Sequence, residues 1–209
     1  GGTLMFATGL LDDLRGVRAL HKLYAQVGAA VIAFALGFRI DAIGLPWIGV
    51  LPMGAFALPV TTLWIVGVIN AVNLIDGLDG LAAGVVFFAG LTNFAVAHLS
   101  GSILVALMMA AIMGSVTGFL FWNFNPAKIF MGDSGSYFLG FLLATSSLAG
   151  VGQKASTTVA LLVPLLALGV PIVDTLLAMV RRYLEHRPLF SPDRGHIHHR
   201  LLDMGLTHR

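Results

Sequence analysis

Two long stretches of this chain carry no charged side chain, and they restrict its fold more than any other feature. Residues 42–75 and 80–127 contain no Lys, Arg, Asp or Glu. Both stretches are long enough for membrane-spanning helices of about 20 residues. Only 11% of the whole chain is charged, against about 25% in soluble domains. The sequence therefore predicts an integral membrane protein and argues against a water-soluble globule.

Apolar segments separated by Gly, Pro and Ser mark the expected membrane spans. We expect six spans, at 23–38, 54–72, 81–98, 102–122, 136–151 and 157–180, after the tail of a seventh helix at 1–11. These segments are too long and too uniformly apolar for barrel strands, which leaves a helical bundle. The fold class predicted is an all-α, polytopic membrane bundle, with residues 1–209 in a single domain. Residues 37–52 should form a short hairpin or an interfacial loop, with Trp47 at headgroup depth.

Basic residues are distributed unequally between the two ends of this predicted bundle. If successive spans alternate in direction, four segments share one face of the membrane: 1–22, 73–80, 123–135 and 181–209. Of the twelve Lys and Arg residues, all but Arg39 and Lys154 fall on that face. The positive-inside rule makes it the cytoplasmic face. Because the polar motifs described next lie on the same face, we expect them to form one composite site.

The segment INAVNLIDGLDGLAAG, residues 69–84, places amides and carboxylates between two apolar runs. Asn70, Asn73, Asp76 and Asp79 have no Lys or Arg beside them. On a continuous helix they form one slowly drifting polar stripe. If the chain instead breaks at Asp76-Gly77, the glycine allows backbone N–H groups to approach an anion. Both arrangements gather oxygen ligands, which suit Mg²⁺ or Mn²⁺ rather than zinc; a loop with Asp-Gly turns is the alternative.

Two further acidic motifs lie at the ends of other expected spans. Asp12 and Asp13 are adjacent, and such carboxylates repel each other unless a cation or a proton-transfer role compensates them. Solvated charges at a helix end are the alternative. Asp133, in the sequence MGDSG, is expected to be a metal ligand or an N-cap, and the helix start beside it favours a bound phosphate. Asn123 and Lys128 belong to the segment that leads to Asp133.

The C-terminal sequence SPDRGHIHHRL combines guanidinium and imidazole groups. His196, His198 and His199 follow Arg194, and their spacing differs from the i, i+4 pair of zinc-binding helices. Such a cluster suits a phosphate or diphosphate better than a metal ion. A basic tail on anionic lipid headgroups is the alternative, which explains the arginines but not three histidines.

Taken together, these motifs resemble those of the polyprenyl-phosphate N-acetylhexosamine-1-phosphate transferases, glycosyltransferase family 4. The matching segments, in family order, are GLLDDLRG, NAVNLIDGLDGLAAG, NFNPAKIFMGDSGS and SPDRGHIHHRL. The sequence HIHH after PDRG is similar to the N-acetylglucosamine-1-phosphate branch rather than to the peptidoglycan translocase. The resemblance implies a multi-pass enzyme of the bacterial cytoplasmic membrane with its active site on the cytoplasmic face. It also implies further spans upstream and, in many members, downstream.

The resemblance implies a reaction and a set of site residues. UDP-N-acetylglucosamine and undecaprenyl phosphate would give undecaprenyl-diphosphate-N-acetylglucosamine and UMP, with Mg²⁺, or Mn²⁺, as cofactor. The catalytic residues would be Asp12, Asp13, Asp76 and Asp79, and the metal ligands Asp133 and Asn73. The substrate-binding residues would be Asn73, Asn123, Lys128, Arg194, His196, His198 and His199. The expected partners are the UDP-sugar, the polyprenyl phosphate and membrane lipid, with a homodimer as a further option.

Other functions fit parts of the sequence. The same chemistry with phospho-N-acetylmuramoyl-pentapeptide stays open. A cation-coupled transporter would bind its ion near the bilayer midplane, yet of the candidate carboxylates only Asp174 lies inside an expected span. An intramembrane aspartyl protease would need two Asp residues deep in facing spans. The chain has no cysteine, which excludes zinc-thiolate sites, and its net charge of +2 gives no reason to expect a nucleic-acid partner.

Overall fold

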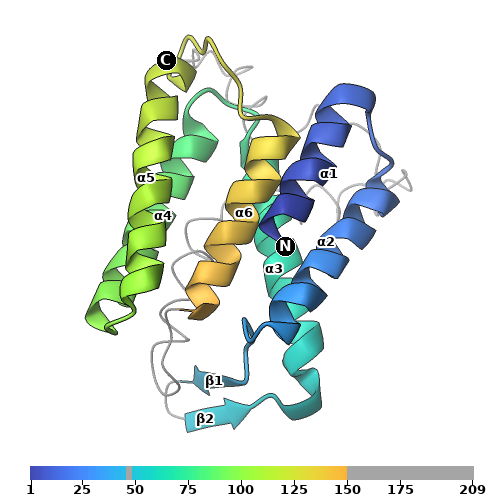
Figure 1. The fold of residues 1–209 in the computed structure, drawn as a ribbon, viewed down its shortest axis with the longest axis vertical. Coiled ribbons are helices and arrows are strands. Elements are labelled where there is room, and N and C mark those ends of the chain that lie inside the picture. Colours follow the sequence, from blue (N-terminus) through green and yellow to red (C-terminus); the bar gives the residue numbers. More distant parts are fainter. Residues whose placement is uncertain (46–48, 150–209) are drawn as a thin grey trace, which may run out of the picture.

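The structure, a computed structural model, describes residues 1–45 and 49–149. Within these ranges six α-helices follow one another, with a two-stranded hairpin between the second and the third (Figure 1). The bounds of the elements are α1 Gly2–Arg15, α2 Ala19–Ala35, β1 Ala42–Leu45, β2 Gly49–Pro52, α3 Ala57–Ile75, α4 Leu81–Leu99, α5 Ile103–Asn123 and α6 Gly132–Ala149. A single turn of 3₁₀ helix, Gly54–Phe56, precedes α3.

The helices lie where the apolar segments predict them. Helices α2 to α6 match the first five expected spans to within four residues at every boundary, and the sixth, 157–180, lies outside the described residues. Three helical segments in the described part are long and apolar enough to cross a membrane: Gly54–Ile75, Leu81–Leu99 and Ile103–Asn123. Helix α2 is apolar but shorter, and α6 is not among the three.

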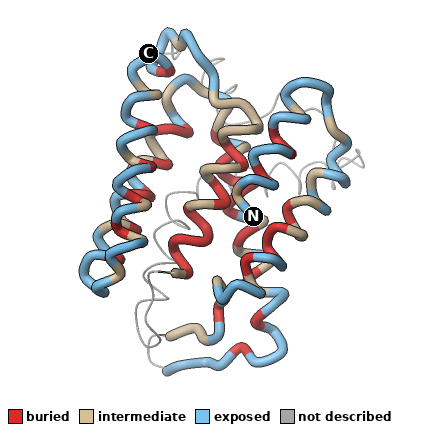
Figure 2. Tube along the Cα trace, in the orientation of Figure 1, coloured by how far each residue is buried: buried red, intermediate tan, exposed pale blue. Residues whose placement is uncertain are grey.

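Helix α6 is more polar than the other expected spans because protein surrounds it. It packs against α1 and α3, and also contacts α4, and Figure 2 shows it as the most continuously buried helix. Buried hydroxyl groups of Thr145, Ser146 and Ser147 donate to carbonyls in the preceding turn. The indole N–H of Trp64 donates to Ser147 Oγ at 3.2 Å, and Asn93 Nδ2 donates to Ser146 Oγ at 3.0 Å. Such bonds between helices satisfy polar groups that lipid would leave unpaired.

Loops gather at two ends of the bundle because consecutive helices alternate in direction (Figure 1). One end, called the site end below, holds the loop between α1 and α2, the turn between α3 and α4, and the loop between α5 and α6. The opposite end holds the hairpin and the turn between α4 and α5. The described segments that we expected on one face, 1–22, 73–80 and 123–135, therefore do share one end. That this end is cytoplasmic stays a prediction.

The expectation of an all-α chain is wrong for residues 42–45 and 49–52, which form strands. Strands β1 and β2 pair antiparallel, with Ala42 opposite Pro52, which is one of the two forms predicted for 37–52. Helix is disfavoured here because the segment AIGLPWIGVLP contains two prolines and two glycines, residues that weaken a helix interior. The backbone N–H of Ile40 donates to Thr61 Oγ at 2.9 Å, which fastens the chain before the hairpin to α3. Trp47 lies outside the described residues.

Candidate active site

Asp13, near the end of α1, caps the N-terminus of α6. Its carboxylate accepts hydrogen bonds from the backbone N–H groups of Asp133, at 2.8 Å, and Ser134, at 3.0 Å. Burial raises the pKa of Asp13, but these N–H groups outweigh burial, and the resulting pKa lies below the usual value. The positive end of the helix dipole favours the same ionised state. Two motifs 120 residues apart are thus joined, and the capping carboxylate comes from Asp13, not from Asp133.

Two glycines allow α1 and α6 to approach closely enough for this cap. A Cβ atom at Gly9 would lie 2.3 Å from the carbonyl oxygen of Asp133, a distance that real Cβ atoms essentially never show. Gly132 has a φ of +66°, and a Cβ atom there would lie 2.9 Å from Asp13 Oδ2. A side chain at either position would push α6 away or remove the cap.

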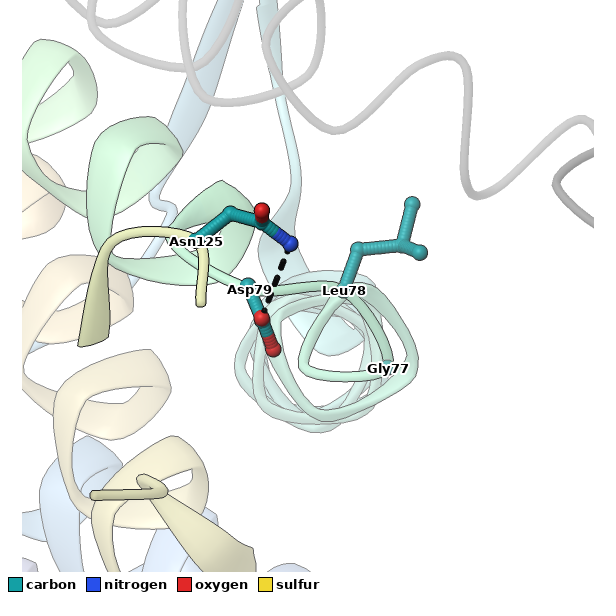
Figure 3. A pocket seen from close by; sticks show the side chains of 4 residues that line it. All are labelled: Gly77, Leu78, Asp79 and Asn125. Atoms are coloured by element: carbon teal, nitrogen blue, oxygen red, sulfur yellow. Dashed lines mark hydrogen bonds between the residues drawn. The ribbon is translucent and has the colours of Figure 1, made fainter. Parts of the chain in front are cut away.

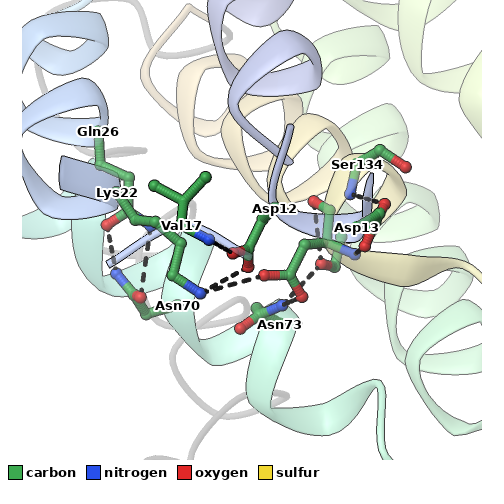
Figure 4. A network of polar contacts seen from close by, with 10 residues as sticks. Asp12, Asp13, Val17, Lys22, Gln26, Asn70, Asn73 and Ser134 are labelled. Atoms are coloured by element: carbon green, nitrogen blue, oxygen red, sulfur yellow. Dashed lines mark hydrogen bonds and ion pairs between the residues drawn. The ribbon is translucent and has the colours of Figure 1, made fainter. Parts of the chain in front are cut away.

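Lys22, in the first turn of α2, bridges two carboxylates of different motifs (Figure 4). Its Nζ atom lies 2.6 Å from Asp12 Oδ2 and 3.4 Å from Asp133 Oδ2. Hydrogen bonding with Asp133 and Lys22 lowers the pKa of Asp12 to about 2, against the opposing effect of burial. Burial lowers the pKa of Lys22, but its contact with Asp12 outweighs this and the net pKa is raised. Both groups are therefore ionised at neutral pH.

Asn73, in the last turns of α3, orients Asp133. Its Nδ2 atom donates to Asp133 Oδ1 at 2.8 Å and to Ser136 Oγ at 3.0 Å. Burial raises the pKa of Asp133, the neighbouring Asp12 raises it further, and the Asn73 amide opposes the rise. Asp133 is thus held by groups from α1, α2 and α3 at once, which fixes the direction of its carboxylate.

Asp76, directly after α3, carries a charge that no described basic side chain neutralises within ion-pair distance. Burial raises its pKa from 3.8 to about 6, and the charges of Asp133 and Asp13 add to the rise. The backbone N–H of Gly132 acts in the opposite direction by hydrogen bonding to the carboxylate. The site end therefore contains a local excess of negative charge.

Asp79 joins the turn between α3 and α4 to the loop between α5 and α6. Its Oδ2 atom accepts hydrogen bonds from Asn125 Nδ2, at 3.2 Å, and from the backbone N–H of Ala127, at 3.0 Å. A pocket of about 250 Å³ lies beside this junction, lined by Gly77, Leu78, Asp79 and Asn125 (Figure 3). The contact between Asp79 and the loop thus shapes a concave surface next to the carboxylate cluster.

Asn123 and Lys128, both expected to bind substrate, have protein partners in the structure. Asn123 is only 5% exposed; its Oδ1 atom accepts from the N–H of Gly80 at 3.0 Å, and its Nδ2 atom donates to the carbonyl of Ile129 at 2.9 Å. Lys128 is exposed, and its Nζ atom lies 5.4 Å from the ring centroid of Trp122. Asn123 therefore supports both loops, and substrate binding by either residue stays a prediction.

Of the expected site residues that the structure describes, five form one connected group: Asp12, Asp13, Asn73, Asp76 and Asp133. Asp79 and Asn123 hold the adjoining loops, and Lys128 lies apart from this group, beside Trp122. Four residues expected to bind substrate lie outside the described residues: Arg194, His196, His198 and His199. Their contact with substrate stays a prediction. Sequence reasoning gave Lys22 no role in the site and counted it only among the basic residues on one face of the predicted bundle. The available signal was its position at the start of an apolar helix, where a charge at the membrane edge usually has a partner.

The oxygen donors at the site end fit a hard divalent cation. Asp133 and Asn73 supply a carboxylate and an amide oxygen, and the raised pKa values of Asp76 and Asp133 show that positive charge would be favourable there. Within 1–45 and 49–149 no three Asp, Glu, His or Cys side chains form a group that would hold an ion by themselves. Mg²⁺ commonly binds one or two carboxylates and takes its other ligands from phosphates and water, and a metal ion at the site end stays a prediction.

Comparison with known sequences supplies the family. The sequence model of glycosyl transferase family 4 matches residues 1–151. The chain is 44% identical to a probable undecaprenyl-phosphate N-acetylglucosaminyl 1-phosphate transferase of Bacillus subtilis, over 100% of this chain and 58% of that protein. It is 38% identical to a decaprenyl-phosphate N-acetylglucosaminephosphotransferase of Mycobacterium tuberculosis, over 100% and 57%. It is 40% identical to a phospho-N-acetylmuramoyl-pentapeptide-transferase of Heliobacterium modesticaldum, over 67% and 48%.

The first two matches cover the whole of this chain and the third covers two thirds of it, and each covers only part of the relative. The chain spans a little over half the length of the first two relatives and about half that of the third. Its apolar helices and the family match together make it an integral membrane protein. By its motifs, by the match over residues 1–151 and by identity along its whole length, the chain belongs to glycosyl transferase family 4.

Proposed function

We propose that the protein containing this chain transfers N-acetylglucosamine-1-phosphate from UDP-N-acetylglucosamine to undecaprenyl phosphate, with release of UMP. The observation that carries the proposal is the convergence of Asp13, Asp76 and Asp133, from three separate motifs, at one end of a bundle of apolar helices. The names of the two relatives matched over the whole chain supply the substrate classes. Mg²⁺ as cofactor is part of the proposal.

The proposed reaction exchanges one phosphoanhydride bond for another. An oxygen of the lipid phosphate attacks the phosphorus of the phosphate group that is esterified to the sugar. The bond from this phosphorus to the bridging oxygen of the diphosphate breaks, and UMP leaves with that oxygen and the electron pair. Because bonds of the same kind are formed and broken, catalysis consists mainly of positioning the phosphates and neutralising their negative charge. A bound Mg²⁺ would supply much of that neutralisation, held by Asp133 and Asn73.

The carboxylates at the site end suit different tasks because their proton affinities differ. With a pKa near 2, Asp12 stays ionised, and together with Lys22 it is suited to fix the geometry around Asp133. Asp76 has a pKa of about 6, close to the second pKa of a phosphate monoester, about 6. A proton exchange between Asp76 and the lipid phosphate is therefore part of the proposal.

The nucleotide is assigned to the pocket between the turn after α3 and the loop after α5. Gly77 and Leu78 supply backbone and an apolar side chain, and Asp79 and Asn125 supply polar groups at the rim. The volume of about 250 Å³ is large enough for a nucleobase with part of its ribose. From there the diphosphate would reach the neighbouring carboxylate cluster.

The position of the site in the bundle favours an enzyme acting on a lipid phosphate over a cation-coupled transporter. Transporters place their ion ligands near the bilayer midplane, whereas Asp12, Asp13, Asp76, Asp79 and Asp133 all lie at the helix ends that form the site end. The phosphate of a polyprenyl phosphate lies at headgroup depth, which is where the helix ends of a membrane-spanning bundle are expected. The excess of basic residues in the segments assigned to it supports a cytoplasmic orientation.

The donor sugar can be tested in membranes that contain the full-length protein. Radiolabelled UDP-N-acetylglucosamine and its N-acetylmuramoyl-pentapeptide counterpart are supplied separately, with undecaprenyl phosphate and Mg²⁺, and lipid-linked label and UMP are measured. We expect both products from UDP-N-acetylglucosamine alone. Product from the pentapeptide donor alone would keep the chemistry and change the substrate, in line with the 40% identity to the Heliobacterium protein. Absence of lipid product from any UDP-sugar, with the protein intact, would refute the function.

A further inference from the structure

The end of α5 exposes two consecutive aromatic side chains, and a lysine from the following loop lies over one of them. Phe121 is 81% exposed and Trp122 55%. The Nζ atom of Lys128 lies 5.4 Å from the centroid of the Trp122 ring. We call Phe121, Trp122 and Lys128 the aromatic–lysine patch. None of them contacts the carboxylates of the site through a hydrogen bond or ion pair within the described structure, so the patch needs an explanation of its own.

Backbone hydrogen bonds hold the patch in place. The N–H of Lys128 donates to the carbonyl of Trp122 at 2.7 Å, so the loop folds back over the end of α5. The opposite side of the same loop is fastened to the protein, because Asn125 and Ala127 donate to Asp79. The loop thus lines the pocket through Asn125 and carries Lys128 over the exposed Trp122 ring.

The length of α5 sets the depth of the patch in a bilayer. The helix has 21 residues and is therefore about 30 Å long, which is the thickness of the hydrocarbon core. Its other end carries the exposed apolar residues Ile103 and Leu104, and α5 packs mainly against α4, leaving its outer face exposed in Figure 2. Phe121 and Trp122 therefore lie where α5 leaves the hydrocarbon at the site end.

The charge of Lys128 fits this boundary. None of the ion pairs in the described part of the chain includes Lys128, and the face of the Trp122 indole holds the amine by cation–π attraction. Tryptophan is enriched at the level of lipid headgroups, and lysine extends from the apolar boundary towards the phosphates. An indole, the adjacent phenyl ring of Phe121 and an ammonium group without an ion-pair partner in the described residues together match a phospholipid. Its phosphate would lie at the amine and its upper acyl chain at the rings.

We propose that the aromatic–lysine patch is a docking surface for membrane phospholipid at the site end of the bundle, with preference for an anionic headgroup. Lys128 binds the headgroup phosphate, and Phe121 and Trp122 contact the glycerol and upper acyl region. Because the loop that carries Lys128 also lines the nucleotide pocket through Asn125, bound lipid holds one wall of that pocket. This assigns Lys128 to bilayer lipid in place of the substrate contact predicted from sequence.

Quenching of tryptophan fluorescence by brominated lipids tests the location. The full-length protein is reconstituted into vesicles of phosphatidylcholine brominated either near the headgroup or near the bilayer centre. The contribution of Trp122 is the difference between the unsubstituted protein and Trp122→Phe, which keeps an aromatic ring at the position. We expect strong quenching of this contribution by the shallow bromines and weak quenching by the deep ones. Equal or deeper quenching, or none because another span or a second copy covers the patch, would overturn the proposal.

The headgroup preference is tested with brominated phosphatidylglycerol diluted into unlabelled phosphatidylcholine. At equal mole fractions it should quench Trp122 about two- to fivefold more than brominated phosphatidylcholine, the enrichment expected for one lysine near an anionic lipid. Lys128→Gln should abolish this preference and keep the quenching by phosphatidylcholine. Arg39→Gln is the matched control, since Arg39 is exposed and pairs with Asp41 at the opposite end; it should keep the preference.

Three results would overturn the headgroup assignment. The first is a preference for phosphatidylglycerol that persists in Lys128→Gln, and the second is its loss in Arg39→Gln. The third is relief of the quenching by a small mole fraction of polyprenyl phosphate, because the patch would then bind the acceptor substrate. These measurements require no turnover, so they succeed or fail independently of the proposed function.

Discussion

At the scale of single residues, the carboxylates of the site differ in what compensates their charge. Asp13 is compensated by the N–H groups at the start of α6, and Asp12 by the ammonium group of Lys22. Asp76 has no basic partner in the described structure and has a raised pKa as a result of burial. Its ionised form therefore destabilises the folded protein when no cation is bound.

Asp76→Asn should stabilise the metal-free protein at neutral pH. The pKa of Asp76 rises from 3.8 to about 6 on folding. The free energy of unfolding therefore decreases as the pH rises through this interval, and it stays at the lower value above it. A shift of this size corresponds to about 3 kcal/mol for a fully buried group, and we discount it to about 1 kcal/mol for solvent screening. In EDTA at pH 7.5 the variant should unfold about 2–4 °C higher, as measured by thermal unfolding in detergent.

Asp79→Asn is the matched control for this prediction. The carboxylate of Asp79 accepts hydrogen bonds from Asn125 and Ala127, so its replacement should leave stability unchanged or lower it. The advantage of Asp76→Asn should also shrink as the pH falls from about 6 towards 3.8. A stabilisation equal at pH 4 and pH 7.5, or the same gain in Asp79→Asn, would show that charge burial at Asp76 is not its cause.

At the scale of elements, the site depends on the position of α6 between α1 and α3. Glycines permit the close approach on both sides. A Cβ atom at Gly9 would meet the backbone of Asp133 at 2.3 Å, and one at Gly140 would lie 2.8 Å from the Cα atom of Ile69. Backbone contacts of this kind allow helices to pack closely in membranes. They also fix the axial position of Asp133 relative to Asp13 and Asn73.

Gly9→Ala should lower both stability and activity, because the added methyl group displaces the first turn of α6. We expect a loss of about 1–3 kcal/mol, typical of overpacking in a close-packed interior. Gly67→Ala is the control, since nothing lies within 4 Å of a Cβ atom at this position in the neighbouring helix α3. Thermal unfolding and turnover are measured for both variants in the full-length protein. Unfolding temperatures equal to that of the unsubstituted protein in both would contradict the packing argument.

At the scale of the whole molecule, the gathering of the motifs at one end could be predicted from the sequence. The length of each apolar segment can be read from the local sequence, which locates the spans. Because successive spans alternate in direction, residues 73–80 and 123–135 then fall at the same end of the bundle. The hairpin was one of two forms predicted for 37–52, because the prolines and glycines exclude a helix without choosing between loop and strand. Helix α6 was correctly placed by its apolar residues, although its central position is not visible in its own sequence.

The contacts within the site could not be predicted in the same way. The cap of α6 by Asp13 depends on the approach of two helices at Gly9, and the bridge by Lys22 depends on the angle between α1 and α2. Asn123 illustrates the same limit, because an amide leaving a span looks available to substrate in the sequence but is buried between two loops in the structure. These are relations between distant segments, and no local pattern encodes them.

The central claim is that the carboxylates at the site end form a single centre for Mg²⁺-dependent phosphoryl transfer. Its most direct test is turnover of UDP-N-acetylglucosamine in membranes containing either full-length protein or its Asp133→Asn variant, across a Mg²⁺ titration starting in EDTA. Asp41→Asn, at the opposite end of the bundle, is the control. We predict that Asp133→Asn lowers Mg²⁺-dependent turnover by about 10²-fold or more while inserting normally, and that Asp41→Asn keeps it. Near-normal, Mg²⁺-dependent turnover in Asp133→Asn would contradict the claim.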